Sequence, residues 1–156
     1  MADGVFVRSD VWLGELLDRH GVEVERRGLQ VRRELDADLP LRRTGAGDRA
    51  LERLLRFAFA TVPDDCEVFV ASARPLSPVA ALGEGDVTLR WQVVGPEAAD
   101  PGETVAPIRP LPGGATAHAR SAAAGELRAA CAALGWPLEL SPANRDREIW
   151  LRVRLR

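Results

Sequence analysis

Few side chains in this sequence are suited to catalysis, and those that are stand far apart. No Ser, Asp or Cys can be named as a catalytic partner of His118, so nucleophilic catalysis is not indicated. His20 is expected to face the dipole at the end of a predicted helix, with a phospho-acceptor as the alternative. With only two cysteines, Cys66 and Cys131, and these scattered histidines, the ligand spacing of a metal site is absent. We interpret both cysteines as buried apolar residues of a reducing compartment, with a disulfide between them as the alternative.

Three other clusters have both a chemical and a structural interpretation. Asp64 and Asp65 could act as paired carboxylates, but they follow Pro63 in a connector, where turn propensity explains them. The glycines Gly113 and Gly114 could be the remnant of a phosphate-binding loop, but they lack the GxxxxGK or GxGxxG motif of such loops. A row of arginines near the C-terminus is predicted to face solvent on an edge strand, with binding of an acidic partner as the alternative. The row consists of Arg152, Arg154 and Arg156.

The composition argues against several classes of function. The chain of 156 residues has a net charge of −2 and a pI near 5.7, so long-range attraction to nucleic acid or anionic membranes is absent. All 21 basic residues are arginine, so no lysine can serve as a Schiff-base nucleophile or phosphate anchor. No apolar run resembles a signal peptide or spans a bilayer. We therefore expect a single cytoplasmic domain over residues 1–156.

The chain is organised around an amphipathic helix followed by a strand. The helix is predicted between Asp48 and Pro63, because apolar side chains recur there at three- and four-residue spacing. These side chains are Leu51, Leu54, Leu55, Ala58, Phe59 and Val62. Val68 and Val70 then begin a half-buried strand.

Shorter patterns on both sides predict two more helices and four more strands. The helices are expected at 11–20 and 122–134, and the strands at 29–35, 87–94, 138–140 and 149–155. Val22 and Val24 are expected to extend or precede the first strand. Residues 95–120 are rich in Pro and Gly without periodicity, which predicts a lid-like loop. This order predicts an α+β fold: a two-layer α/β sandwich whose mixed, mostly antiparallel sheet is covered on one face by three helices.

Four segments in this order resemble the ATP-binding domain of sensor histidine kinases, the GHKL or Bergerat fold. The first is similar to the family's run from a strand end through an asparagine-bearing helix into the next strand. The others are similar to the strand that carries DxGxG, the helix and strand that begin at GLGLA, and the closing strand. The segments read LDADLPLRRTGAGDRALERLLRFAFATVPDDCEVFV, DVTLRWQVVGPE, SAAAGELRAACAALGWPLEL and REIWLRVRLR. The resemblance covers nearly the whole chain and implies a Bergerat-like sandwich.

The residues that bind nucleotide in that family are replaced in this chain. The resemblance places the asparagine that helps hold Mg²⁺ at Phe57, which has no oxygen ligand, and its companion asparagine at Arg53. The aspartate that accepts a hydrogen bond from adenine matches Val93. One motif glycine is kept as Gly95. At the other motif positions a side chain can block the approach of backbone amides to phosphate. These positions are Glu97, Ser121 and Ala123.

These replacements predict that the nucleotide pocket has closed. The central helix and the strand at 87–94 form a crease that we expect Phe57 and Val93 to fill, because an unpaired polar group buried there would cost about 1–3 kcal/mol. No catalytic residue, cofactor or metal is then expected. No segment resembles the dimerising histidine helices of the kinases, so we do not expect autophosphorylation by this chain alone.

We expect a non-catalytic domain that binds another protein, and the resemblance suggests a response regulator, a kinase or a sigma-type regulator. The suspected contacts are residues 96–112, the C-terminal arginines and two tryptophans expected to be exposed, Trp12 and Trp136. Two alternatives stay open. One is a divergent kinase domain that still holds nucleotide through Arg53, Glu97 and loop amides. The other is a small-molecule sensor that uses the apolar crease.

Overall fold

The computed structural model describes residues 4–76, 79–92, 117–143 and 148–156. The helices are α1 (Ser9–Asp18), α2 (Gly21–Arg26), α3 (Gly45–Thr61) and α4 (Ala117–Ala133). The strands are β1 (Val5–Arg8), β2 (Gln30–Glu34), β3 (Pro40–Arg43), β4 (Glu67–Ala73), β5 (Gly85–Gln92), β6 (Leu138–Ala143) and β7 (Glu148–Leu155). In the part of the chain that the structure describes, no helix is long and apolar enough to cross a membrane.

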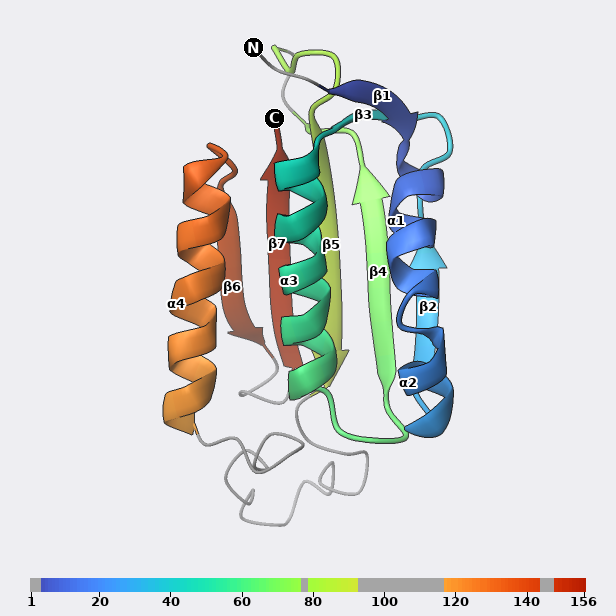
Figure 1. Cartoon of the computed structure of the whole chain (residues 1–156), viewed down its shortest axis with the longest axis vertical. Coiled ribbons are helices and arrows are strands. Elements are labelled where there is room, and N and C mark those ends of the chain that lie inside the picture. Colours follow the sequence, from blue (N-terminus) through green and yellow to red (C-terminus); the bar gives the residue numbers. More distant parts are fainter. Residues whose placement is uncertain (1–3, 77–78, 93–116, 144–147) are drawn as a thin grey trace.

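Five of the strands form one mixed sheet in the order β2-β4-β5-β7-β6. Strands β2 and β4 run parallel, and the other pairings in this sheet are antiparallel. The helices lie on one face of the sheet, with α3 across β5 and β7 (Figure 1). Strands β1 and β3 form a separate two-stranded sheet. The predicted sandwich is confirmed, because the helices bury one face of the sheet as the alternation within β5 and β7 requires.

Helix α3 is built as its sequence pattern predicts. The Thr44 side chain caps its first turn by accepting a hydrogen bond from the backbone N–H of Gly47 at 2.9 Å. The apolar stripe of the helix is buried against the sheet, while Arg53 and Arg56 face away from it. The helix begins at Gly45, three residues before the predicted start at Asp48, because the Thr44 side chain caps it there.

Several local predictions are wrong. Val22 and Val24 lie in the short helix α2, a fourth helix that was not predicted. Their spacing of two residues suits a strand, but Val24 N–H donates to His20 O and Leu29 N–H to Val24 O, which are local turn contacts. Helix α4 begins at Ala117, so the last residues of the predicted loop at 95–120 are helical. Residues 95–116 lie outside the described residues.

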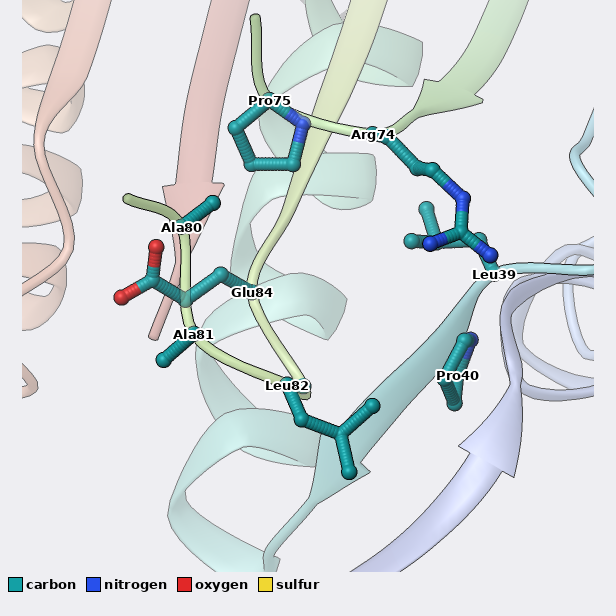
Figure 2. A pocket seen from close by; sticks show the side chains of 9 residues that line it. Leu39, Pro40, Arg74, Pro75, Ala80, Ala81, Leu82 and Glu84 are labelled. Atoms are coloured by element: carbon teal, nitrogen blue, oxygen red, sulfur yellow. The ribbon is translucent and has the colours of Figure 1, made fainter. Parts of the chain in front are cut away.

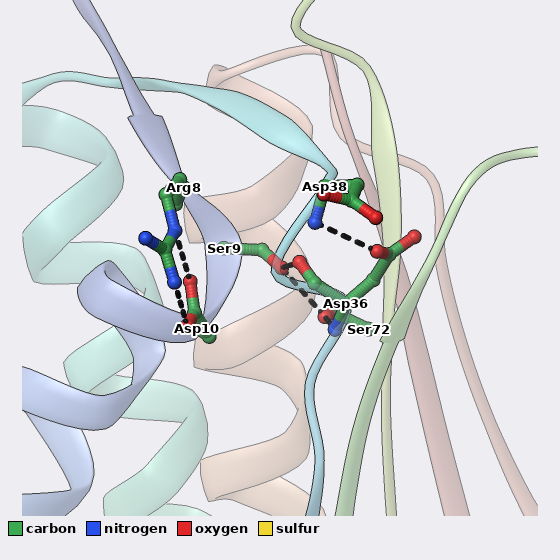
Figure 3. Close-up of polar contacts among 6 residues, drawn as sticks. All are labelled: Arg8, Ser9, Asp10, Asp36, Asp38 and Ser72. Carbon is green, nitrogen blue, oxygen red and sulfur yellow. Dashed lines mark hydrogen bonds and ion pairs between the residues drawn. The ribbon is translucent and has the colours of Figure 1, made fainter.

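A buried hydroxyl pair joins α1, the segment after β2 and strand β4. The Oγ atoms of Ser9 and Ser72 lie 2.7 Å apart, and Ser9 Oγ also donates to the carbonyl of Asp36. The Asp36 N–H donates in turn to Ser72 Oγ at 2.8 Å (Figure 3). Both serines are buried, so each hydrogen bond replaces one that water would otherwise make.

We expect Ser72→Ala to lower the free energy of unfolding by about 1–3 kcal/mol, because it leaves the Asp36 N–H and the Ser9 hydroxyl short of a partner. Urea denaturation measures this effect. In a double-mutant cycle, Ser9→Ala and Ser72→Ala should be coupled, since they act on one network. Additive effects of the two substitutions would contradict this account of the pair.

Candidate functional site

The crease between α3 and β5 is filled by two aromatic rings. Phe57 on α3 is 7% exposed and Trp91 on β5 is 1% exposed. Their ring centroids lie 6.1 Å apart with an interplanar angle of 74°, which is the edge-to-face arrangement that aromatic pairs prefer. Phe57 stands at the position on the central helix that the resemblance assigns to the metal-binding asparagine.

Neighbouring strands fix the position of Trp91. It stands opposite Val68 of β4 and Ile149 of β7, so its strand is hydrogen-bonded on both sides. Phe57 belongs to the buried stripe of α3, together with Leu54 and Ala58. Because both rings are held by regular elements, opening the crease would require moving a helix or a central strand.

The indole N–H of Trp91 is buried, and no acceptor for it is found in the part of the chain that the structure describes. A buried donor without an acceptor costs free energy, so the crease contains one polar group that its apolar side chains do not satisfy. Trp91 was not predicted as the partner of Phe57. The signal was present in the sequence, because the alternation predicted for the strand at 87–94 puts Trp91 and Val93 on the same face.

The other matched residues that the structure describes do not converge on this crease. Arg53 is exposed on α3, and Ala123 is exposed on α4. Ser121 stands inside α4 and not at its N-terminus, where amides would be available to phosphate. Three matched positions lie outside the described residues: Val93, Gly95 and Glu97. Among the described members of this set, the structure therefore places Phe57 alone in the crease.

The prediction that Trp12 and Trp136 are exposed is wrong. Trp12 is 0% exposed and Trp136 is 5% exposed. The Trp12 indole N–H donates to Asp48 at 2.6 Å, and both indoles pack at Gly47. A Cβ atom at Gly47 would lie 3.2 Å from each of the two rings, so the glycine leaves room for them. The two indoles belong to the core between α1, α3 and α4 and offer no contact surface.

The arginine row lies on the face of the sheet opposite the helices, but not on an edge strand. Strand β7 pairs with β5 on one side and β6 on the other, so the prediction of an edge is wrong. Arg152 pairs with Glu139 at 2.7 Å and Arg154 with Asp86 at 2.9 Å. The hydrogen bond to Asp86 raises the pKa of the Arg154 guanidinium. Both arginines are thus held by cross-strand ion pairs.

The remaining reactive side chains do not form a catalytic cluster. His20 Nε2 lies 2.9 Å from a carboxylate oxygen of Glu52, a contact between the α1–α2 turn and α3 that the sequence did not reveal. Cys66 and Cys131 are buried and are not joined by a disulfide, and burial raises the pKa of the Cys131 thiol. Among the described residues, no group of His, Cys, Asp and Glu could hold a metal ion.

A pocket of about 290 Å³ lies at the N-terminal end of β5, whereas Trp91 lies near the C-terminal end of that strand. Figure 2 shows Arg74 and Glu84 on opposite sides of it. The Arg74 guanidinium already donates one hydrogen bond, to the carbonyl of Asp38 at 3.0 Å. The lining residues are Leu39, Pro40, Arg74, Pro75, Ala80, Ala81, Leu82, Gly83 and Glu84. This pocket is separate from the Phe57–Trp91 crease, where a small-molecule site was considered.

Comparison with solved structures identifies the fold. The chain superposes on the catalytic domain of histidine kinase ThkA, in a nucleotide-free form, with a TM-score of 0.65 over 98% of this chain and 96% of that one. This chain has the fold of a histidine kinase catalytic domain. The mycobacterial sensor histidine kinase MprB gives a TM-score of 0.57 over 99% of this chain and 97% of that one. A histidine kinase from Burkholderia phymatum gives a TM-score of 0.65 over 98% of this chain and 70% of that one.

The likeness to histidine kinase catalytic domains lies in structure far more than in sequence. Identity is 9% to ThkA, 17% to MprB and 18% to the Burkholderia phymatum kinase. The sequence itself matches no family model and no curated protein. The predicted Bergerat-like architecture is confirmed, while the activity of this domain has to be argued from its own residues.

Proposed function

We propose that this chain is a non-catalytic, histidine-kinase-ATPase-like domain that acts in cytoplasmic bacterial signalling by binding another protein. The fold shared with kinase catalytic domains supports a place in two-component signalling. The observation that carries the non-catalytic assignment is the ring pair of Phe57 and Trp91 in the crease between α3 and β5.

The chemistry of the crease explains why this pair opposes nucleotide binding. Mg²⁺ requires oxygen ligands in near-octahedral geometry, and the helix position that would supply one carries a phenyl ring. The ring is buried against Trp91, so a nucleotide would have to displace packed aromatic surface to enter. The exposed guanidinium of Arg53 faces away from the sheet, which does not favour the alternative of nucleotide held by that arginine.

Isothermal titration calorimetry with ATP and Mg²⁺ tests the proposal. We expect no heat of binding at nucleotide concentrations of about 1 mM, where even a site worth only about 4 kcal/mol would begin to fill. A histidine kinase catalytic domain that binds ATP, titrated under the same conditions, serves as the positive control. Binding with micromolar affinity would overturn the proposal in favour of a divergent, nucleotide-binding kinase domain.

A further inference from the structure

The face of the sheet opposite the helices carries an aromatic and arginine stack. Phe69 of β4, Arg90 of β5 and Trp150 of β7 stand directly opposite one another in the register of the three strands. The Arg90 guanidinium lies 5.2 Å from the Phe69 ring centroid and 5.3 Å from that of Trp150. Both distances suit cation–π contacts, so the stack fixes a guanidinium at the centre of this face.

Trp150 differs from the other tryptophans of the chain. It is 40% exposed, whereas Trp12, Trp91 and Trp136 are at most 5% exposed. Its strand lies inside the sheet, between β5 and β6, and the helices lie on the other face (Figure 1). A tryptophan and an arginine side by side on an exposed face are the residue types most enriched among binding hot spots.

Arg90 also differs from the other arginines that lie within the strands on this face. Arg32, Arg152 and Arg154 each have a carboxylate partner, in the pairs Arg32–Glu67 at 3.8 Å, Arg152–Glu139 at 2.7 Å and Arg154–Asp86 at 2.9 Å. For Arg90, no carboxylate lies within ion-pair distance among the side chains that the structure describes. The guanidinium lies within cation–π distance of a ring on each neighbouring strand. Its N–H groups can donate to a carboxylate in bidentate fashion.

We propose that the stack of Phe69, Arg90 and Trp150 is the docking site for an acidic segment of a partner protein. In this arrangement a carboxylate of the partner pairs with Arg90, while a neighbouring apolar side chain packs on Trp150. The stack holds the guanidinium in place before binding, which reduces the entropy lost on association. This inference rests on the proposed protein-binding function and names the surface that performs it.

The charges around the stack favour a protein segment over a nucleic acid. Glu67, Asp86 and Glu139 are spread over the same face and would repel a continuous polyanion. Their partner arginines are already neutralised, so at the stack Arg90 is the cation that is left for a carboxylate. An isolated Asp or Glu beside an apolar residue fits this pattern, and a run of phosphates does not.

Selection of displayed random peptides on the immobilised full chain tests the docking site. We expect enriched peptides to carry Asp or Glu next to an apolar residue, and synthetic copies to bind in fluorescence anisotropy. Arg90→Gln and Trp150→Ala should each weaken their binding about tenfold or more. Arg90→Lys should also weaken it, because an ammonium cannot form the bidentate pair. Arg56→Gln, an exposed arginine on α3, serves as the control and should change nothing.

Three results would overturn the docking site. These are the selection of no acidic peptide, peptides that bind Arg90→Gln as well as the wild type, and preferred binding of single-stranded oligo-dT through Arg90. Peptides that bind independently of Arg90 would refute this surface but leave a protein-binding function standing. Nucleotide binding in the calorimeter would refute the non-catalytic assignment without touching Arg90. Unchanged far-UV circular dichroism and an unchanged urea midpoint of each variant show that weaker binding is not caused by misfolding.

Discussion

Phe57→Asn is expected to lower the free energy of unfolding by about 3–5 kcal/mol, as large-to-small substitutions of aromatic core residues do. The substitution removes the edge-to-face contact with Trp91 and leaves a cavity between α3 and β5. It also buries an amide group for which the crease offers no metal ion and no nucleotide phosphate. Restoring the residue type that the kinases use at this position should therefore cost stability and restore no ATP binding. Urea denaturation and calorimetry with Mg²⁺–ATP measure the two parts of this prediction.

The control for this substitution is Ala60→Asn, which places the same side chain on the exposed face of α3. It should cost only the difference in helix propensity, about 0.5–0.7 kcal/mol. If Phe57→Asn proves as stable as Ala60→Asn, the ring pair does not fill the crease as described. If Phe57→Asn binds ATP, a single ring was all that closed the pocket, and the rest of the site has survived.

Arg27→Met is expected to lower the free energy of unfolding by about 2–4 kcal/mol, because it removes charge-assisted hydrogen bonds to buried acceptors. The Arg27 guanidinium is buried and donates to the carbonyls of Phe59 and Val62 at the C-terminal end of α3. It also donates to Asp64 at 2.7 Å. A cation at this end of the helix complements the helix dipole, and it satisfies carbonyls that have no partner within the helix. Methionine fills similar volume but leaves these acceptors without a donor.

Arg26→Met is the matched control, because Arg26 is the exposed last residue of α2, directly before Arg27. Its effect on the free energy of unfolding should be small, about 0.5 kcal/mol or less. Equal losses for the two variants would show that the interaction with α3 contributes nothing beyond ordinary surface charge. Chemical denaturation of both variants under the same conditions separates these outcomes.

The parts of the fold that the sequence predicted correctly have strong local periodicity. The apolar stripe of α3 and the alternation of β5 and β7 each require one buried face, and the structure buries that face. Short elements could not be predicted this way, because four residues of strand carry too little pattern. Strands β1 and β3 were missed for this reason, and α2 was mistaken for part of a strand.

The remaining features that were not predicted, or were predicted wrongly, depend on contacts between segments that are distant in the sequence. The role of Arg27 depends on its meeting the end of α3, and the burial of Trp12 depends on Asp48 and Gly47. Neither contact leaves a periodic signal in the sequence. Similarly, β7 is an internal strand because β6 pairs with it. The order of the strands in the sheet determines this, and the composition of β7 does not reveal it. At the candidate site, the place of Phe57 in the crease was predicted and its contact with Trp91 was not, while the predicted partner Val93 lies outside the described residues.

The most direct test of the filled crease is the indole ¹H–¹⁵N resonance of Trp91 during titration with Mg²⁺–ADP. The chain has four tryptophans, so Trp91→Phe assigns the resonance by its disappearance. We predict that it stays unchanged up to about 1 mM nucleotide, because the ring is packed against Phe57 and excludes the base. A saturable shift of this resonance, with density for adenine beside Phe57 in a crystal soaked with ADP, would contradict the account.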